Sequence, residues 1–122
     1  LAREIGWALA RIARRLGLEG VAYRPAWYHT AYSGRYHFVF ADSRRQGRFE
    51  AMQRDLRDIP LIEVTRAAAE GRLRNHGERC TWEAEEMVFW LFDSPLDEKI
   101  VAEERANARF TIVASECDKH VP

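Results

Sequence analysis

The chain has 122 residues, 47% hydrophobic, 11% aromatic and 31% charged, so it can bury the core of one domain without disulfide or metal cross-links. Its 19 basic and 19 acidic residues balance, and together with the aromatic content this excludes an intrinsically disordered segment. The longest uninterrupted apolar run, Met87–Phe92, is far shorter than the roughly 20 residues of a membrane-spanning helix.

The two cysteines, Cys80 and Cys117, fit no metal-ligand or redox-motif spacing. A secreted domain of this length often contains more cysteines, and the charged N-terminal segment lacks the apolar core of a signal peptide. We therefore predict a cytoplasmic protein without a metal site or a cofactor.

Charge is unevenly distributed along the chain. Residues 1–60 contain 11 basic and 6 acidic residues, whereas residues 61–122 contain 8 basic and 13 acidic ones. Seventeen of the 19 basic residues are arginine, which reflects either a GC-rich genome or a need for planar, bidentate hydrogen-bond donors.

The first predicted element is a helix over about residues 2–16. Large apolar residues recur there at helical spacing and form one stripe, made of Ile5, Leu9, Ile12 and Leu16. Gly17 and Gly20 follow and suit the end of a helix.

Residues 21–41 are rich in aromatic and β-branched side chains and are predicted to form two strands joined by a tight turn at Ser33-Gly34. Alternation in this hairpin gives a core face and an amphipathic face. The core face carries Trp27, His29, Ala31, Tyr36, Phe38 and Phe40. The second face carries Tyr28, Thr30, Tyr32, Arg35, His37 and Val39.

Two helices are predicted at about 44–57 and 61–74, separated by Pro60. A strand over 79–92 follows, with the apolar run 87–92 buried on both faces. Ser94-Pro95 opens a short helix, 110–115 is the last strand, and the tail 116–122 is expected to be loose. The order is α-β-β-α-α-β-α-β. We predict a single α+β domain spanning 1–122, in which one mostly antiparallel sheet of about four strands packs against helices.

The candidate ligand-binding residues belong to the predicted hairpin: Trp27, Tyr28, His29, Thr30, Tyr32, Arg35, Tyr36 and His37. His29 on an apolar face is either a tuned base or a core histidine bonded to a backbone carbonyl. The group around His37 offers aromatic surface, hydroxyls and one cation, which suits a planar or anionic small molecule. The same residues equally suit the solvent side of a hairpin.

Two further clusters have weaker chemical patterns. Glu83 and Glu85 share one face of the predicted strand and either approach a common ion or form a solvated strand edge. Cys80 and His76 flank the turn at Gly77 and form either a Cys/His pair or ordinary strand residues.

Trp7 lies opposite the apolar stripe of the first helix, among Arg3, Arg11 and Arg14. This arrangement predicts a contact surface for a second subunit, another protein or a nucleic acid, unless Trp7 is covered by its own chain.

We therefore expect a non-catalytic module that binds a small molecule or a protein and acts as a homodimer. One alternative is a small enzyme that uses His29 or His37 as a general base. Another is a winged-helix-like module built from the helices at 44–57 and 61–74. The zero net charge, and the mixed charges of Glu63, Arg66, Glu70 and Arg74 on the second helix, argue against nucleic-acid binding.

Overall fold

The computed structural model describes residues 2–114, so the predicted loose tail and the last residue of the predicted final strand, Ser115, lie outside the described residues. In chain order the elements are α1 (Ala2–Arg15), β1 (Gly20–Tyr23), α2 (Tyr28–Ser33), β2 (Val39–Phe40), α3 (Ser43–Asp55), α4 (Leu61–Ala69), β3 (Leu73–Asn75), β4 (Glu78–Arg79), β5 (Met87–Trp90), α5 (Glu98–Asn107) and β6 (Phe110–Ile112). The fold is mixed α+β, as predicted.

The strands form two small antiparallel sheets, and the prediction of a single sheet was therefore wrong. Sheet A has the order β1-β5-β2 and sheet B the order β4-β3-β6. In sheet A, Val21 is opposite Phe89 and Phe40 is opposite Met87, so β5 is the central strand. This position agrees with the predicted double burial of the apolar run, although only Met87 and Val88 are fully buried.

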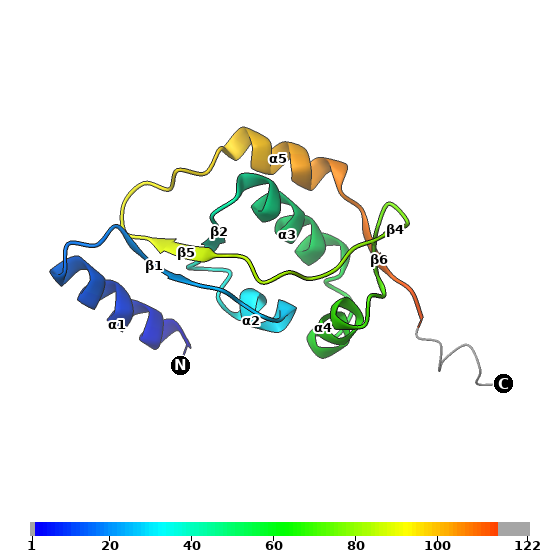
Figure 1. The fold of residues 1–122 in the computed structure, drawn as a ribbon, viewed down its shortest axis with the longest axis horizontal. Helices are drawn as coiled ribbons and strands as arrows, with labels where there is room; N and C mark the ends of the chain where they lie inside the picture. The colour runs from blue at the N-terminus through cyan, green and yellow to red at the C-terminus, as the bar shows by residue number, and fades with distance from the viewer. Residues whose placement is uncertain (1, 115–122) are drawn as a thin grey trace.

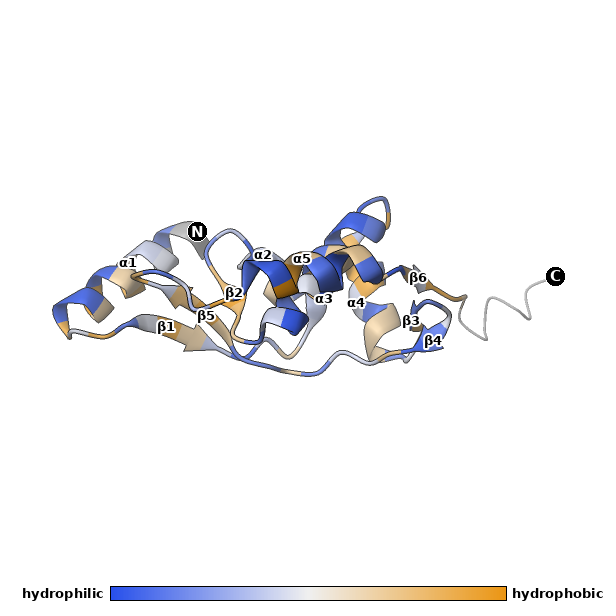
Figure 2. Ribbon diagram, turned by 90° about the horizontal axis from the view of Figure 1, so that it is seen from above, coloured by the Kyte–Doolittle hydropathy of each residue, from blue (hydrophilic) through white to orange (hydrophobic). Residues whose placement is uncertain are grey.

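The two sheets lie at opposite ends of the molecule, with α3 between them. Figure 1 shows α1 beside β1 at one end, α5 alongside α3, and sheet B next to the end of the described chain. Figure 2, seen from above, shows the same separation along the longest axis, with α4 near sheet B. Among the described residues, no helix combines the length and apolarity that crossing a membrane requires.

The predicted hairpin at residues 21–41 is absent, because Tyr28–Ser33 form the helix α2. Tyr28 and Ala31 are buried at helical spacing, whereas an alternating strand would place them on opposite faces. The aromatic residues of this segment fill gaps between helices instead of pairing across strands, which shows how strongly strand propensity depends on tertiary context.

Element boundaries also differ from prediction in the second half of the chain. The helix expected over 61–74 ends at Ala69, because Gly71 adopts a left-handed conformation (φ 75°) and the chain turns into β3. Residues 80–86 are outside the strands and interrupt the strand expected over 79–92. The last helix begins at Glu98 instead of Pro95, because the Asp97 carboxylate caps it by accepting from the backbone N–H groups of residues 99 and 100.

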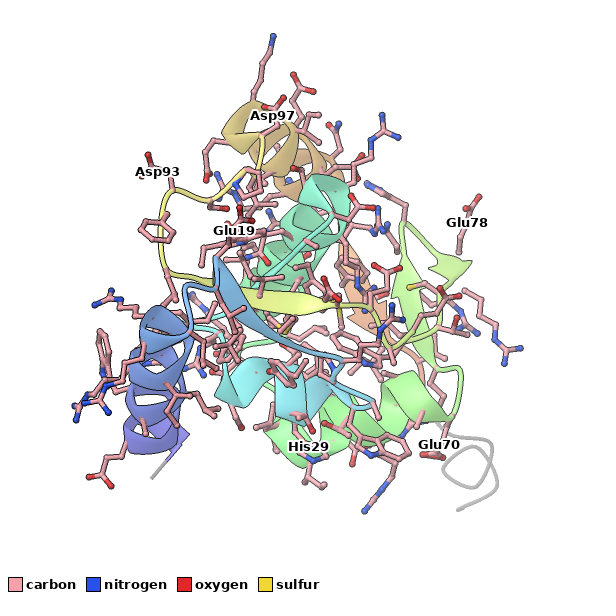
Figure 3. All side chains as sticks on the ribbon, turned by 60° about the vertical axis from the view of Figure 1, so that its left-hand side comes forward. Glu19, His29, Glu70, Glu78, Asp93 and Asp97 are labelled. Atoms are coloured by element: carbon pink, nitrogen blue, oxygen red, sulfur yellow. The ribbon has the colours of Figure 1, made fainter. Side chains whose placement is uncertain are left out.

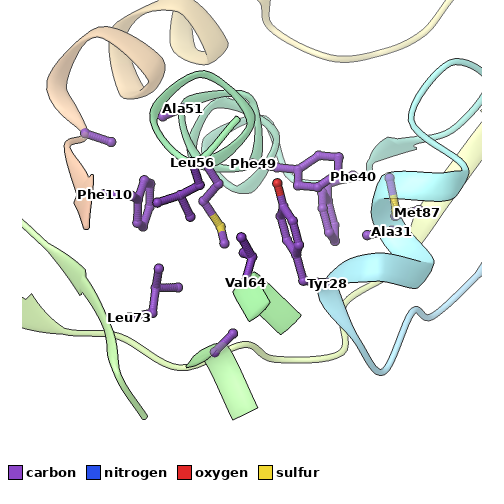
Figure 4. Close-up of a cluster of buried hydrophobic side chains, with 13 residues drawn as sticks. Tyr28, Ala31, Phe40, Phe49, Ala51, Leu56, Val64, Leu73, Met87 and Phe110 are labelled. Atoms are coloured by element: carbon purple, nitrogen blue, oxygen red, sulfur yellow. The ribbon is translucent and has the colours of Figure 1, made fainter. Parts of the chain in front are cut away.

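The largest group of buried side chains surrounds α3. Figure 4 shows it as a layer between α3, α2 and the strands, made of residues that include Tyr28, Phe40, Phe49, Leu56, Val64, Leu73, Met87 and Phe110. Phe49 contacts Tyr28 and Phe40 edge to face, at 6.0 and 5.2 Å between ring centroids. This geometry favours aromatic pairs beyond the area they bury.

Helices α3 and α5 approach each other most closely at Gly47. A Cβ atom at this position would lie 2.5 Å from the Val101 carbonyl oxygen and 2.7 Å from Cβ of Glu104. Real Cβ atoms do not approach backbone atoms this closely, so the position accepts only glycine without a shift of one helix.

The C-terminal end of α3 holds the connection between α5 and β6. Arg54 donates hydrogen bonds to the carbonyl oxygens of Arg105 and Ala108, both at 2.7 Å. Asp55 accepts one from the backbone N–H of Phe110 at 2.8 Å. Burial alone would raise the pKa of Asp55, but the hydrogen bonds from Arg54 and Phe110 outweigh this effect and lower it.

Substituting Gly47→Ala is expected to destabilise the protein by about 1–3 kcal/mol, because overpacking at the α3–α5 contact outweighs the gain of about 1 kcal/mol in helix propensity. Equilibrium unfolding in urea measures the difference. Gly6→Ala in α1 is the matched control, since nothing lies within 4 Å of a Cβ there, and it is expected to leave stability unchanged or higher. Equal effects of the two substitutions would contradict the close contact at Gly47.

The free energy of unfolding is expected to fall in acid, partly because Asp55 becomes protonated. A carboxylate whose pKa is lower in the folded state contributes stability that is present above its unfolded value of about 3.9 and is lost as the pH falls through the folded value. Urea unfolding between pH 7 and pH 2.5 should therefore show Asp55→Asn less stable than wild type near neutrality, with a difference that shrinks in acid. Asp58→Asn, at an exposed carboxylate, controls for the removal of one charge. A stability difference between wild type and Asp55→Asn that does not change with pH would rule out this role of the Asp55 carboxylate.

Candidate functional site

The candidate ligand-binding residues, predicted on the two faces of a hairpin, are distributed around α2 and do not form one site. Tyr28 is a core residue in contact with Phe49 and Trp82. Burial, with a further contribution from nearby Tyr32, raises the pKa of Tyr28, so its phenol stays neutral. Trp27, which precedes the helix, is half exposed, in contrast to its predicted place on the core face.

His29 lies on α2 beside α4 (Figure 3). Its backbone N–H donates to Oγ1 of Thr65 at 3.1 Å, and this bond ties the two helices together. Its Nδ1 atom is buried and has no hydrogen-bond partner among the described residues. Of the two predicted roles, the core histidine fits the half-buried position, although the expected bond from the ring to a carbonyl is missing.

Arg35 is held between two tyrosines. Its guanidinium carbon lies 3.6 Å from the ring centroid of Tyr32 and 4.3 Å from that of Tyr36. It also donates to the hydroxyl of Tyr36 at 2.9 Å and to the carbonyl oxygen of Tyr32 at 2.8 Å. Because Tyr36 is 77% exposed, this stack lies at the surface, and two of the five guanidinium N–H groups already have partners.

His37 is placed against the aromatic residues of α1 and sheet A. Its imidazole stacks on Phe89 at 5.6 Å between centroids, and the ring of Trp7 meets it edge to face at 5.7 Å. Within residues 2–114, no hydrogen bond or ion pair links His37 or His29 to a carboxylate. No contact with a carboxylate therefore supports a histidine general base, and that alternative stays a prediction.

A groove lies between α1, β1 and α2, with a volume of about 660 Å³. We call it the α1 groove. Its lining is made of Gly6, Leu9, Val21, Ala22, Tyr23, Thr30, Ser33, Gly34, Tyr36, His37 and Phe38. Three of the predicted ligand-binding residues, Thr30, Tyr36 and His37, therefore meet here, and apolar side chains supply much of the remaining wall.

Small residues place α1 against sheet A. Gly6, Ala10 and Ala13 recur at helical spacing and are buried. Three residues of the large apolar stripe predicted from the sequence are instead exposed, Leu9 at 42%, Ile12 at 55% and Leu16 at 69%. At Gly6 the space beside the helix is open, with nothing within 4 Å of the place of a Cβ atom, and the groove opens there.

The predicted interface residues on α1 lie wholly or partly at the surface, and their role as an interface stays a prediction. Arg11 and Arg14 are exposed. Trp7 is half exposed, and its ring also contacts Phe89 edge to face at 6.0 Å, so its own chain covers one side. The side chain of Arg3, which the sequence places in the same group, lies outside the described side chains.

Among the described residues, neither weaker cluster has the metal-ligand or Cys/His geometry that one of its two interpretations requires. Glu83 and Glu85 lie in the irregular segment before β5, so they do not share a strand face. His76 contacts the carbonyl oxygen of Asn107 instead of pairing with Cys80, whose pKa is raised by burial. Across residues 2–114 no group of three or more potential metal ligands converges.

The expected winged-helix order is present, because the strands β3 and β4 follow α3 and α4. On α4, however, Glu63 pairs with Arg66 at 3.7 Å, so a basic residue expected to contact phosphates is bound to a carboxylate. This internal pairing gives no support to a nucleic-acid surface.

Sequence reasoning missed the residues that build the groove from α1 and β1. The signal that could have found them is the helical spacing of Gly6, Ala10 and Ala13, which marks a second face of α1 made of small residues. The groove cannot be read from one segment, because its walls come from three elements and the following loop.

Comparison with known proteins gives no family for this chain: no protein-family model, no curated protein and no solved structure matched it.

Proposed function

We propose that this chain is a non-catalytic binding module that holds a small, mainly apolar ligand in the α1 groove. The observation that carries the proposal is the groove itself, with a volume of about 660 Å³ and walls from α1, β1 and α2. This volume is within the range of about 300–1,000 Å³ typical of small-molecule sites, and apolar walls with few polar groups are typical of them.

The polar groups of the groove have a limited role. Tyr23, on its wall, donates its hydroxyl to the carbonyl oxygen of Thr30 at 3.1 Å, which fixes the end of β1 to α2. Ser33 donates to the carbonyl oxygen of His29 at 2.9 Å. The imidazole of His37, stacked on Phe89, is the polar ring left to orient a ligand. These contacts favour an apolar body with at most one or two hydrogen-bonding groups.

The uncharged dye N-phenyl-1-naphthylamine tests this proposal, because its emission rises when it enters an apolar site. We expect saturable binding to the wild-type protein. Ala22→Trp should weaken it at least about tenfold by filling the groove, since Ala22 is an exposed strand residue on the groove wall.

Thr111→Trp is the matched control, because Thr111 is an exposed strand residue on β6 outside the groove lining, and binding should be unchanged. Equal dye binding by all three proteins would contradict a site in the α1 groove. Circular dichroism checks that each variant is folded.

The exposed stripe of α1 supports a second proposal, that two copies of the chain pair through this helix. Leu9, Ile12, Leu16 and Leu18 are all at least 42% exposed and form a continuous apolar surface at and after α1. Contiguous exposed apolar residues of this kind are typical of interaction sites.

The charges beside the stripe favour an antiparallel arrangement of the two helices. Glu4 and Arg15 are both exposed and are separated by three helical turns, so they lie on one side of α1 at opposite ends. In an antiparallel pair, Glu4 of each copy would face Arg15 of the other. The same pairing would cover the mouth of the α1 groove, on whose wall Leu9 lies.

Sedimentation equilibrium tests this pairing through a charge swap. We expect a dimer for the wild type, at least about fivefold weaker association for Glu4→Arg and for Arg15→Glu, and recovery in the double variant. Ile12→Glu should give a monomer, because it places a charge on the apolar stripe. A wild-type monomer at high micromolar concentration, or no recovery in the double variant, would contradict the pairing.

A further inference from the structure

A second cavity, of about 420 Å³, lies between α3, β4 and the irregular segment 80–86. We call it the Arg45 pocket. Three arginines line it together with apolar side chains that include core residues: Arg45, Arg48 and Arg79, with Leu73, Trp82 and Phe110. It shares no lining residue with the α1 groove and is independent of it.

Arg45 is fixed in place but poorly satisfied. It is only 8% exposed, and its guanidinium carbon lies 4.3 Å from the ring centroid of Trp82 and 4.8 Å from that of Phe40. Nη2 donates to the carbonyl oxygen of Glu83 at 3.2 Å. Nε is buried and has no hydrogen-bond partner among the described residues.

The nearest carboxylate does not satisfy this charge. Oε2 of Glu85 lies 3.8 Å from Nε of Arg45, beyond hydrogen-bond distance. Burial lowers the pKa of Arg45, and Glu85 offsets this only in part. A guanidinium has five donors and stays charged in proteins, so burial without an anion is costly.

The other charges of the pocket leave a net positive lining. Arg48 has Glu104 at 3.8 Å, and Arg79 is exposed, while Glu83 and Glu85 are the acidic residues of the wall. Three guanidinium groups therefore surround one cavity with two carboxylates. Guanidinium groups bind carboxylate and phosphate through paired hydrogen bonds.

We propose that the Arg45 pocket binds a small organic oxyanion, a carboxylate or a phosphate, attached to an apolar or aromatic body. The oxyanion accepts from the free donors of Arg45 and takes the place of Glu85. The body lies against Leu73, Trp82 and Phe110. A bare ion would leave this apolar wall uncovered, so the organic anion binds more tightly.

Isothermal titration calorimetry with phenyl phosphate, benzoate and inorganic phosphate, at constant ionic strength, tests the proposal. Phenyl phosphate is expected to bind saturably and at least about tenfold more tightly than inorganic phosphate, because its ring buries apolar surface. Comparison of phenyl phosphate with benzoate distinguishes a phosphate ligand from a carboxylate ligand.

Three substitutions locate the site. Arg45→Gln should weaken phenyl phosphate binding at least about tenfold, because it removes the buried cation. Glu85→Gln should strengthen binding about threefold or more, because it removes the competing carboxylate. Arg44→Gln is the matched control: Arg44 is the neighbouring, exposed residue of α3, outside the pocket lining, and affinity should not change.

The absence of saturable binding by both wild type and Glu85→Gln would overturn the proposal, as would equal affinity of wild type and folded Arg45→Gln. Should circular dichroism show Arg45→Gln unfolded, Arg79→Gln at the exposed rim replaces it, with an expected loss of about threefold or more. Unchanged affinity for phenyl phosphate in both Arg79→Gln and Glu85→Gln would then overturn the proposed anion site.

Discussion

The close approach of α3 to α5 at Gly47 is the constraint on which the rest of the structure depends. With no side chain between the two backbones, the polar residues of α3 reach their neighbours directly. Ser43 Oγ accepts from the backbone N–H of Asp97 at the start of α5, and Glu50 accepts from Arg105 at 2.6 Å. Gln46 accepts from the backbone N–H of Phe40 at 2.8 Å and so fixes β2. One helix therefore positions α5, β6 and sheet A.

The segment from residue 80 to residue 90 connects the two proposed binding sites. Its first part forms a wall of the Arg45 pocket, where Trp82 covers Arg45 and donates its indole N–H to the carbonyl oxygen of Pro25 at 3.1 Å. Its second part is β5, whose Phe89 stacks on the imidazole of His37 in the α1 groove. The irregular segment 80–86 thus covers the buried Arg45 and continues directly into β5, the central strand of sheet A.

The sequence was sufficient where a segment follows one hydrophobic pattern over its whole length. The helices α1, α3 and α4 were predicted because apolar residues recur at helical spacing, and β5 because its residues are continuously apolar. The hairpin at residues 21–41 failed because Tyr28, Tyr32 and their aromatic neighbours satisfy a strand pattern, whereas tertiary contacts with Phe49 and Trp82 select a helix. No local pattern can report such a contact.

The candidate sites were less predictable than the fold, for a related reason. Thr30, Tyr36 and His37 were selected for their chemistry and do meet in one groove, but the wall opposite them comes from α1. Arg45 has no distinguishing feature in sequence beside Arg44, and the two differ only because the helix turns one inward and the other outward. A buried arginine can be identified as a candidate site only when its unpaired Nε and the cavity beside it are both known. The proposed anion site therefore depends on how the fold encloses Arg45 and leaves Arg44 at the surface.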